Sequence, residues 1–446
     1  MAQEGGIDIV RDAFRYQNRF SGSKMVIKVD FPVTEDAGFS YLIKDLALVV
    51  KSGVKVVVVP GCAEWIDAAL LSQNIVCRYA GTERITTQAA LPFVEMAAFQ
   101  AATRFITGLS GSRVDALIGN FVRARACGVI GGVDMLHTGE VDKIFAASLG
   151  RVLDFGMVPI LPCIGWSPSG KPYNVSSDEI ALAVSQSLGA VKLIIVSAGQ
   201  FLPALEAGGF SIPEFIERGE DGRIIRLRPH EAETLLTLSH YKKFDVERPK
   251  WISQLELALR AAESGIERIH IIDGQEEGAL LREIFTNLGS GTMIYADEQD
   301  LIRPMRSSEV PDVLHLMEPY VRRDILVRRS VDDIQEKKDD YVVLAIDDSI
   351  RACGALHDWG EGAAEIAALA SDPAFTEMGL GRRIVDYLLT KARKAGFKRA
   401  FVLTTRTQDW FEAYGFAETP IDSLPARKRA LYNPERKSKA YALDLF

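Results

Sequence analysis

Glu377-Met378-Gly379-Leu380-Gly381-Arg382 is the stretch that decides the fold of the second half of this sequence. Before it, residues 363–370 are mostly small and apolar, with Glu365 among them, and predict a strand. After it, Ile384, Leu388 and Ala392 recur at the spacing of one helix face. Glycines at a helix start let the backbone approach a ligand, and the N–H groups there attract phosphate. The stretch predicts a phosphate-binding turn, with an ordinary tight turn as the simpler alternative.

The segments around this turn predict a mixed sheet that contains antiparallel strands. Residues 341–346 and 350–356 are apolar runs on either side of Asp347-Asp348-Ser349, which is a good hairpin signal. Further strands are expected at residues 301–305, 400–404 and 439–445, and helices at residues 309–320 and 408–414.

The first part of the chain follows a different pattern, in which short apolar runs alternate with amphipathic stretches. Strands are expected at residues 25–29, 54–59, 158–161, 191–196, 269–272 and 292–295, and helices at residues 39–52, 86–107, 177–188 and 251–264. Continuous apolar strands between helices predict an α/β domain with a doubly wound, mainly parallel sheet. Residues 119–132 are expected to form a hairpin. The polar stretch 296–300 marks the boundary, which gives domains at residues 1–296 and 297–446.

Composition and charge exclude several classes of protein. The net charge of −8 over 446 residues argues against general nucleic-acid binding. The five cysteines contain no CxxC pair and the six histidines no HExxH pair, so we expect neither a disulfide framework nor a metal site. No secretory signal and no membrane-spanning run is visible, so we expect a cytoplasmic protein without a membrane partner.

The order strand, hairpin, strand, glycine turn, helix, strand, helix resembles the GCN5-related N-acetyltransferase fold, whose members bind acetyl-CoA through such a turn. In that family the turn usually begins with Arg or Gln, where this chain has Thr376. Residues 409–416 resemble the family's aromatic segment, with Phe411 where many relatives carry an acidic tyrosine, so a tyrosine acid is excluded at that position. The resemblance implies acetyl-CoA as cosubstrate, with contacts at Leu369, Ala370, Met378, Gly379, Gly381 and Arg382.

Four further segments resemble the N-acetylglutamate synthase family: residues 324–330, 364–367, 402–406 and 431–439. In bacteria that family joins an amino-acid-kinase-like domain to an acetyltransferase domain, so the resemblance covers the whole chain. It implies transfer of an acetyl group from acetyl-CoA to the amino group of L-glutamate, the first step of arginine biosynthesis. The alternatives are an acetylglutamate kinase with an appended acetyltransferase module, a non-catalytic arginine sensor, or an enzyme for another amine.

Glutamate carries two carboxylates, and an arginine side chain can bind a carboxylate with two parallel hydrogen bonds. The resemblance implies that Arg328 or its neighbour Arg329, with Arg436 and Ser438, holds these carboxylates, and that Ala368 also contacts the substrate. A solvated basic surface is the alternative for the arginines.

Glu365 lies among small apolar residues of an expected strand, where an unpaired carboxylate is costly. A desolvated glutamate suits a general base, and the resemblance implies that Glu365 deprotonates the amine through water. Backbone N–H groups around Ala368 and Leu369 would polarise the thioester carbonyl. Thr404 matches the hydroxyl residue that protonates the departing thiolate. The alternatives are an exposed strand-face glutamate and, for Thr404, an ordinary strand residue with water as the acid.

The first domain resembles acetylglutamate kinase at residues 110–111, 119–122, 137–139 and 174–179. A working kinase of that family carries glycine-rich turns around the ATP phosphates. The corresponding stretches here are Lys28-Val29-Asp30-Phe31-Pro32 and Val59-Pro60-Gly61-Cys62-Ala63-Glu64. Proline has no N–H to donate, and Asp30 opposes phosphate, so we expect no kinase activity.

The resemblance also implies an arginine-binding site in this domain. A guanidinium suits a carboxylate and aromatic packing, and the alternative is a core histidine with a surface glutamate. L-arginine would be a feedback effector that binds one domain arrangement better than another. Relatives of this domain associate through the first helix, so a homo-oligomer is expected. The implied arginine contacts are Tyr16, Phe20, His270, Glu283 and Gly289.

Overall fold

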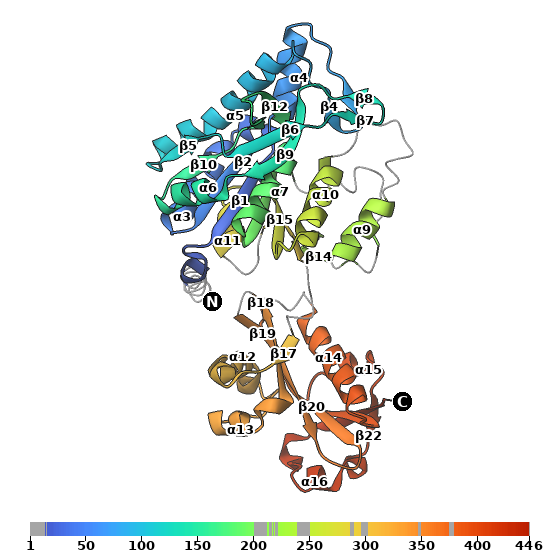
Figure 1. The fold of residues 1–446 in the computed structure, drawn as a ribbon. Coiled ribbons are helices and arrows are strands. Elements are labelled where there is room, and N and C mark those ends of the chain that lie inside the picture. The colour runs from blue at the N-terminus through green and yellow to red at the C-terminus, as the bar shows by residue number, and fades with distance from the viewer. Residues whose placement is uncertain are drawn as a thin grey trace. The chain divides into compact units, whose positions relative to one another are not determined.

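The computed structural model describes residues 14, 16–199, 212–213, 216, 218, 222–238, 250–285, 290–295, 302–346, 349–373 and 379–445. The chain divides into two compact units, Met1–Ala296 and Asp297–Phe446. Figure 1 labels most of their elements.

Within the described residues, the first unit is built on an eight-stranded sheet (Figure 1). Neighbouring strands are parallel except β15 and β16, which are antiparallel. The order across the sheet is β14 (Arg226–Leu227), β16 (Thr292–Tyr295), β15 (Arg268–Asp273), β13 (Lys192–Ser197), β1 (Lys24–Val29), β2 (Lys55–Pro60), β10 (Val158–Ile160) and β5 (Ala116–Ile118).

Helices cover both faces of this sheet, which explains why its central strands are apolar on both sides. Alternate residues of β1 enter different cores: Ile27 packs with α3, α5 and α11, and Val26 packs with α6, α7 and α10. The predicted doubly wound, mainly parallel domain is therefore confirmed. The helices of this unit with defined bounds in the described residues are α2 (Phe31–Glu35), α3 (Phe39–Lys51), α4 (Ala63–Ser72), α5 (Leu91–Gly111), α6 (Ala146–Asp154), α7 (Ser177–Leu188), α9 (Pro229–Leu238), α10 (Lys250–Glu263) and α11 (Ala279–Phe285).

The prediction of a hairpin within residues 119–132 is wrong, because the main partner strand lies outside this range. β6 (Val122–Ala126) pairs with β9 (Thr138–Ile144), and only the short β7 (Val129–Ile130) pairs with β8 (Val133–Asp134). The glycines of the expected turn therefore lie at the tip of the longer segment that connects β6 to β9. β6 and β9 close a small barrel with β11 (Ile164–Trp166) and β12 (Pro172–Val175), and β3 (Tyr79–Ala80) pairs with β4 (Glu83–Arg84) nearby in the sequence.

The helix expected from residue 86 begins at Leu91 instead. Pro92 occupies its first turn, where the missing N–H removes no helical hydrogen bond. Thr86 is fully buried and forms an isolated bridge with Leu136. The apolar period thus extends further towards the N-terminus than the helix does.

The second unit, as far as it is described, holds a seven-stranded sheet that is antiparallel except between β20 and β21. Its order is β17 (Ile302–Pro304), β18 (Tyr341–Ile346), β19 (Ser349–Asp358), β20 (Ala363–Ser371), β21 (Arg399–Thr404), β23 (Lys439–Asp444) and β22 (Ala417–Thr419).

Helices flank this second sheet on two faces. The apolar side of α14, including Ile384 and Leu388, packs on one face, and α12 packs on the other through Val313 and Met317. The mixed α/β prediction is confirmed. The remaining elements are α12 (Val310–Arg322), α13 (Val331–Glu336), α14 (Leu380–Lys394), α15 (Gln408–Glu412), α16 (Ala426–Arg429), and the 3-10 turns η2 (Ser307–Glu309), η3 (Lys338–Asp340), η5 (Ile421–Ser423) and η6 (Pro434–Arg436).

All five cysteines are free thiols. Among the described residues, no helix combines the length and the apolar character needed to cross a bilayer.

Candidate active site

The sheet of the second unit opens between β20 and β21. Three residue pairs join these strands, and the last of them is Glu365 with Phe401. Beyond that pair, β20 continues to Ser371 and β21 to Thr404, but the two strands do not pair with each other again in the described structure. Backbone groups on the inner edges of this gap have no strand partner there and are available to a ligand. Glu365 lies at the closed end of the gap and Thr404 at its open end.

A bulge on β20 lies along this gap. The register with β19 shifts between Cys353 and Ala355, so Ala368 and Leu369 together oppose one residue. Ala368 has φ +53°, a left-handed conformation that is uncommon outside glycine. The Cys353 thiol donates to the Ala368 carbonyl at 3.4 Å, and burial raises the pKa of that thiol to about 12. Cys353 is thus a packed structural thiol, and the bulge re-aims the backbone of the residues implied in ligand binding.

Glu365 is buried, with 5% of its surface exposed, and its carboxylate accepts hydrogen bonds from two side chains. Lys428 Nζ lies 2.7 Å from both carboxylate oxygens. Trp359 Nε1 donates to Oε2 at 2.7 Å. On the neighbouring strand, His357 is the direct cross-strand partner of Glu365. The alternative of an exposed strand-face glutamate therefore does not apply.

The Thr404 hydroxyl organises the turn that follows β21. Its Oγ1 accepts the backbone N–H of Thr407 at 3.0 Å and that of Arg406 at 3.3 Å, and it lies 2.7 Å from Thr407 Oγ1. Because both backbone N–H groups point at the oxygen, its proton is directed away from them, towards Thr407 or a ligand.

Three segments that are far apart in the sequence meet at one backbone carbonyl. Arg436 Nη2 donates to the carbonyl of Asp324 at 3.1 Å, and Thr405 Oγ1 donates to the same oxygen at 3.4 Å. Ser438 is buried directly before β23, whose first residue, Lys439, pairs with Thr404. The 324–330, 402–406 and 431–439 segments therefore converge at the open end of the gap.

The two adjacent arginines of the 324–330 segment have different surroundings. Arg329 Nη1 donates to the Tyr341 hydroxyl and to His357 Nε2, the latter at 3.2 Å. His357 Nδ1 donates in turn to Asp340 at 2.6 Å, and burial lowers the pKa of His357, so the imidazole is neutral and Nε2 can accept. The side chain of Arg328 is 75% exposed and lies 3.6 Å from Glu318. Arg329 is thus held by the protein, while Arg328 faces solvent.

The glycine turn leads into α14 with the geometry of a helix cap. Gly379 has φ +58°, and Arg383 N–H is bonded to its carbonyl at 3.1 Å. The N–H groups of the residues between them, Leu380 to Arg382, therefore point out of the helix start. A Cβ added at Gly381 would meet nothing within 4 Å, so open space lies beside that residue. Met378 is outside the described residues.

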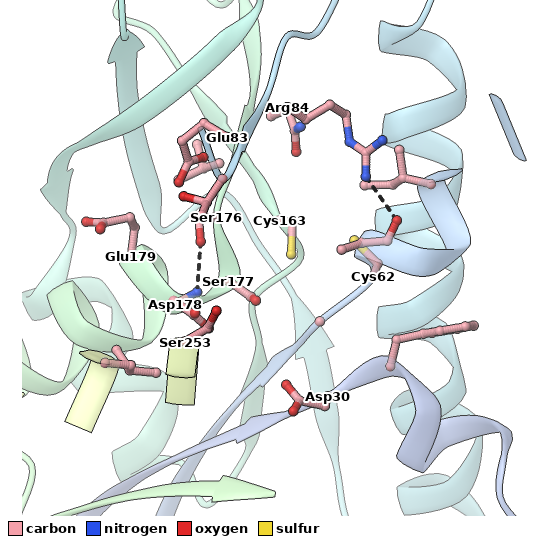
Figure 2. Close-up of a pocket in the computed structure, with 18 of the residues that line it drawn as sticks. Asp30, Cys62, Glu83, Arg84, Cys163, Ser176, Ser177, Asp178, Glu179 and Ser253 are labelled. Atoms are coloured by element: carbon pink, nitrogen blue, oxygen red, sulfur yellow. Dashed lines mark hydrogen bonds between the residues drawn. The ribbon is translucent and has the colours of Figure 1, made fainter. Parts of the chain in front are cut away.

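The described part of the first unit contains a cavity of about 670 Å³ next to the sequences that replace the kinase glycine turns (Figure 2). Lys28 Nζ contacts Asp30 and lies 2.9 Å from Asp178. Burial alone would lower the pKa of Lys28, but Asp178 and Asp30 outweigh it and raise that pKa. In Figure 2, Glu83, Asp178 and Glu179 lie on one side of this cavity. The lysine charge is consequently neutralised and its surroundings are acidic.

The residues implied in arginine binding come together around a buried lysine. His270 and Glu283 share a hydrogen bond, and Lys192 Nζ donates to the Glu283 carbonyl at 3.3 Å. Lys192 Nζ also lies 4.8 Å from the centre of the Phe20 ring, which stacks on Tyr16 at 5.9 Å. Gly289 is outside the described residues.

Burial governs the charges in this cluster. It lowers the pKa of His270 to about 4, with Lys192 adding to the effect, and it lowers the pKa of Lys192 to about 7. Burial also opposes ionisation of Glu283, but His270, the Ser290 N–H and Lys192 outweigh it and lower the pKa of Glu283 to about 2. The alternative of a surface glutamate does not apply, because Glu283 is 6% exposed.

Sequence reasoning did not find Lys428, His357 or Lys192. Lys428 belongs to the basic run Arg427-Lys428-Arg429, which looks like an ordinary solvated surface. A signal was available for the other two, because a charged or polar side chain within an apolar strand needs a partner. Among the described residues, no group of three or more His, Cys, Asp or Glu side chains could hold a metal ion.

Comparison with known proteins extends these observations to the whole chain. The amino acid kinase family model matches residues 24–199, and the acetyltransferase (GNAT) family model matches residues 309–416. The amino-acid acetyltransferase of Pseudomonas fluorescens strain Pf0-1 is 31% identical over 452 residues, covering 98% of this chain and 99% of the relative. That of Escherichia coli K12 is 30% identical, covering 98% and 97%.

Solved structures agree with these matches. The N-acetylglutamate synthase of Neisseria gonorrhoeae, complexed with coenzyme A and L-arginine, is 28% identical with a TM-score of 0.82 and covers 98% of this chain and 99% of that one. The same enzyme complexed with coenzyme A and N-acetyl-glutamate has a TM-score of 0.60, with 28% identity and 99% of each chain covered. The similarity thus includes both units and nearly every residue, and the chain belongs to the amino-acid acetyltransferase family.

Proposed function

We propose that this protein transfers the acetyl group of acetyl-CoA to the amino group of L-glutamate, which gives N-acetyl-L-glutamate and begins arginine biosynthesis. One observation carries the proposal: the 324–330, 402–406 and 431–439 segments meet at the Asp324 carbonyl, beside the gap that Glu365 closes. The gonococcal synthase, which is similar over its whole length, has been solved with coenzyme A and N-acetyl-glutamate.

The surroundings of the arginines suggest how the two carboxylates of glutamate are held. Arg328 and Arg436 would bind them, because the Arg328 side chain is exposed and Arg436 uses Nη2 on backbone carbonyls and has further N–H groups to donate. Arg329 would fix the loop, since Tyr341 and His357 already engage it. Ser438 and the backbone of Ala368 would complete the contacts.

The reaction requires that the glutamate ammonium loses a proton before its nitrogen attacks the thioester carbon. Glu365 would take that proton, directly or through water, and pass it to solvent. The N–C bond forms as the carbonyl becomes an oxyanion, which backbone N–H groups near Ala368 and Leu369 would stabilise. Collapse breaks the C–S bond, and the second proton of the nitrogen ends on the thiolate, through Thr404 or water.

Acetyl-CoA would lie along the gap with its pyrophosphate at the start of α14. Three outward N–H groups, the open space at Gly381 and the Arg382 side chain fit a diphosphate at a helix N-terminus. Leu369 and Ala370 would contact the pantetheine arm, and Met378 belongs to the same turn.

In the first unit, L-arginine would bind as an effector near Tyr16, Phe20, His270, Glu283 and Gly289. The buried imidazole–carboxylate pair beside an aromatic ring supports this, as does the arginine bound to the gonococcal relative. His270 and the Ser290 N–H already form hydrogen bonds with the Glu283 carboxylate. Glu283 would therefore shape the site, and backbone carbonyls would accept the hydrogen bonds of the arginine guanidinium.

We propose no phosphoryl transfer in this unit, since Asp30 and Asp178 occupy the lysine that would meet a phosphate. Association of several chains through the first helix stays a prediction. A cytoplasmic location also stays a prediction.

The test is CoA thiol release from acetyl-CoA with glutamate, aspartate, glutamine or ornithine, each with and without arginine, together with an assay of ATP consumption with N-acetylglutamate. Release with glutamate alone, altered by arginine and without ATP turnover, supports the proposal. Thiol release with another amine instead of glutamate would overturn the substrate, and ATP-dependent phosphorylation would overturn the absence of kinase activity.

A further inference from the structure

Lys428 contacts the carboxylate of Glu365 although the two residues are 63 positions apart in the sequence. Its Nζ lies 2.7 Å from Oε1 and 2.7 Å from Oε2, and the two side chains are only 16% and 6% exposed. An ammonium that contacts both oxygens at this burial restricts the rotation of the carboxylate, because breaking the contact would leave a buried charge without its partner.

Trp359 completes a three-sided arrangement. Its Nε1 donates to Glu365 Oε2 at 2.7 Å, and the Lys428 ammonium lies 4.8 Å from the centre of a Trp359 ring. Each of the three side chains therefore contacts the other two. His357, two positions before this tryptophan, is the cross-strand neighbour of Glu365.

The backbone of Lys428 is anchored by contacts that do not involve its charge. The N–H of Ala426, at the start of α16, donates to Glu361 Oε1 at 3.1 Å. Just before the helix, Leu424 is 4% exposed and belongs to a small core with Ala363 and Phe401. Removing the ammonium therefore leaves the segment attached, and an effect on turnover can be separated from an effect on folding.

The neighbouring side chains supply a contrast. Arg427 and Arg429, on either side of Lys428, are exposed to solvent, whereas Lys428 turns into the protein. Successive residues of a helix point about 100° apart, so the middle residue can face the protein while its two neighbours stay in solvent. The group that Lys428 meets there is the carboxylate of the candidate general base.

Resting on the proposed acetyl transfer, we infer that Lys428 is a positioning residue for Glu365. Together with Trp359 it fixes the carboxylate at the closed end of the β20–β21 gap, in the orientation in which it takes the proton of the substrate ammonium. The proton moves from the amino nitrogen to Glu365 and then to solvent. In this role Lys428 touches neither substrate nor acyl donor.

The experiment compares the full-length chain with Lys428→Met, Lys428→Arg, Trp359→Phe and the matched control Arg427→Met, which removes the same charge from the exposed side of the same helix. Steady-state thiol release is measured while glutamate and acetyl-CoA are varied separately. We expect Lys428→Met to lower kcat about 10- to 100-fold, the scale of a misplaced reacting group. KM for acetyl-CoA should stay within about twofold, Lys428→Arg should restore most of kcat, and Arg427→Met should match the wild type within about twofold.

A double-mutant cycle shows whether Lys428 acts through Glu365. In a Glu365→Gln background, Lys428→Met should cause little additional loss of kcat, because the base it positions is already absent. Loss by the same factor in both backgrounds, as general misfolding would give, overturns the inference. So does full turnover of Lys428→Met, or a failure of Lys428→Arg to recover it while its thermal midpoint equals that of the wild type.

Failure of the inference and failure of the proposed function have different signatures. If the wild type releases no thiol with glutamate or any other amino acid tested, the proposed function fails. If the wild type is active and Lys428→Met is equally active, only the positioning role fails.

Discussion

Glu365 lies where two adjacent strands part, and its buried carboxylate can accept a proton from an amine. Glu365→Gln keeps the size of the side chain and removes the base. We expect kcat to fall about 10²- to 10⁴-fold with KM for glutamate changed only a few-fold, since general-base catalysis contributes on that scale. Thiol release at neutral pH measures both, and unchanged turnover there would remove Glu365 from the base role.

Arg436 makes a different prediction, which concerns substrate affinity. Arg436→Ala should raise KM for glutamate about 10- to 100-fold, because a charge-assisted bond to a carboxylate contributes roughly 1.5–3 kcal/mol. Arg436→Lys keeps the charge without the fork and should fall between. The control is Lys437→Gln, an exposed neighbour of the same charge. If KM for glutamate is the same in Arg436→Ala and the wild type, the arginine does not hold a carboxylate.

Single residues also show where sequence reasoning ends. The sequence predicts roles for Glu365, Thr404 and Arg436 because each stands in a motif that resembles a family, and these roles stay predictions. It could not separate Arg328 from Arg329, since only the fold places Tyr341 and His357 against one of them. The sequence pattern missed Lys428 for the same reason, because Lys428 and the carboxylate of Glu365 become neighbours only when the chain folds.

At the scale of elements, the start of α14 can be tested with Gly381→Ala. Alanine is more favourable than glycine inside a helix by roughly 0.5–1 kcal/mol, and the structure leaves room for the new Cβ, so the thermal midpoint of the free chain should rise slightly. The same methyl group would occupy the space expected for the diphosphate, so KM for acetyl-CoA should rise several-fold while KM for glutamate stays unchanged. A variant that is more stable and binds acetyl-CoA normally would place the diphosphate elsewhere.

Elements with a strong local period were predicted well and those that depend on distant partners were not. Residues 25–29 and 191–196 are β-branched runs that became neighbouring buried strands, β1 and β13. The partner of β6 was misplaced because it lies beyond a glycine-rich tip, and turn signals report only on nearby residues. The sequence did not signal the β20–β21 gap. The gap arises because the pairing between these two strands stops after Glu365 and Phe401, which only the fold shows.

At the scale of the whole molecule, the buried His270 should make the free energy of unfolding fall at acid pH. Burial lowers its pKa from 6.5 to about 4, so between those pH values the unfolded chain binds a proton that the folded chain does not. The free energy of unfolding is therefore highest above pH 6.5 and falls as the pH drops to 4, by at most about 3 kcal/mol from this group. Glu283, with its pKa lowered from 4.5 to about 2, continues the loss between those values.

Urea denaturation of the wild type and of His270→Gln at pH 7.5, 6, 5 and 4.5 measures this dependence. We expect the wild type to lose stability more steeply than the variant across the series, since glutamine does not titrate. Parallel curves would mean that His270 is not buried in its neutral form.

The gap between β20 and β21 also has a consequence for the stability of the protein. Backbone N–H and C=O groups that pair with no neighbouring strand reduce the stability of the native state. An elongated ligand with its own carbonyl and N–H groups can form hydrogen bonds with them and so recover that stability. A ligand present at a hundred times its dissociation constant adds about 2.7 kcal/mol to the stability of whatever binds it. Bound acetyl-CoA would then raise the free energy of unfolding of the chain, and its removal would lower it.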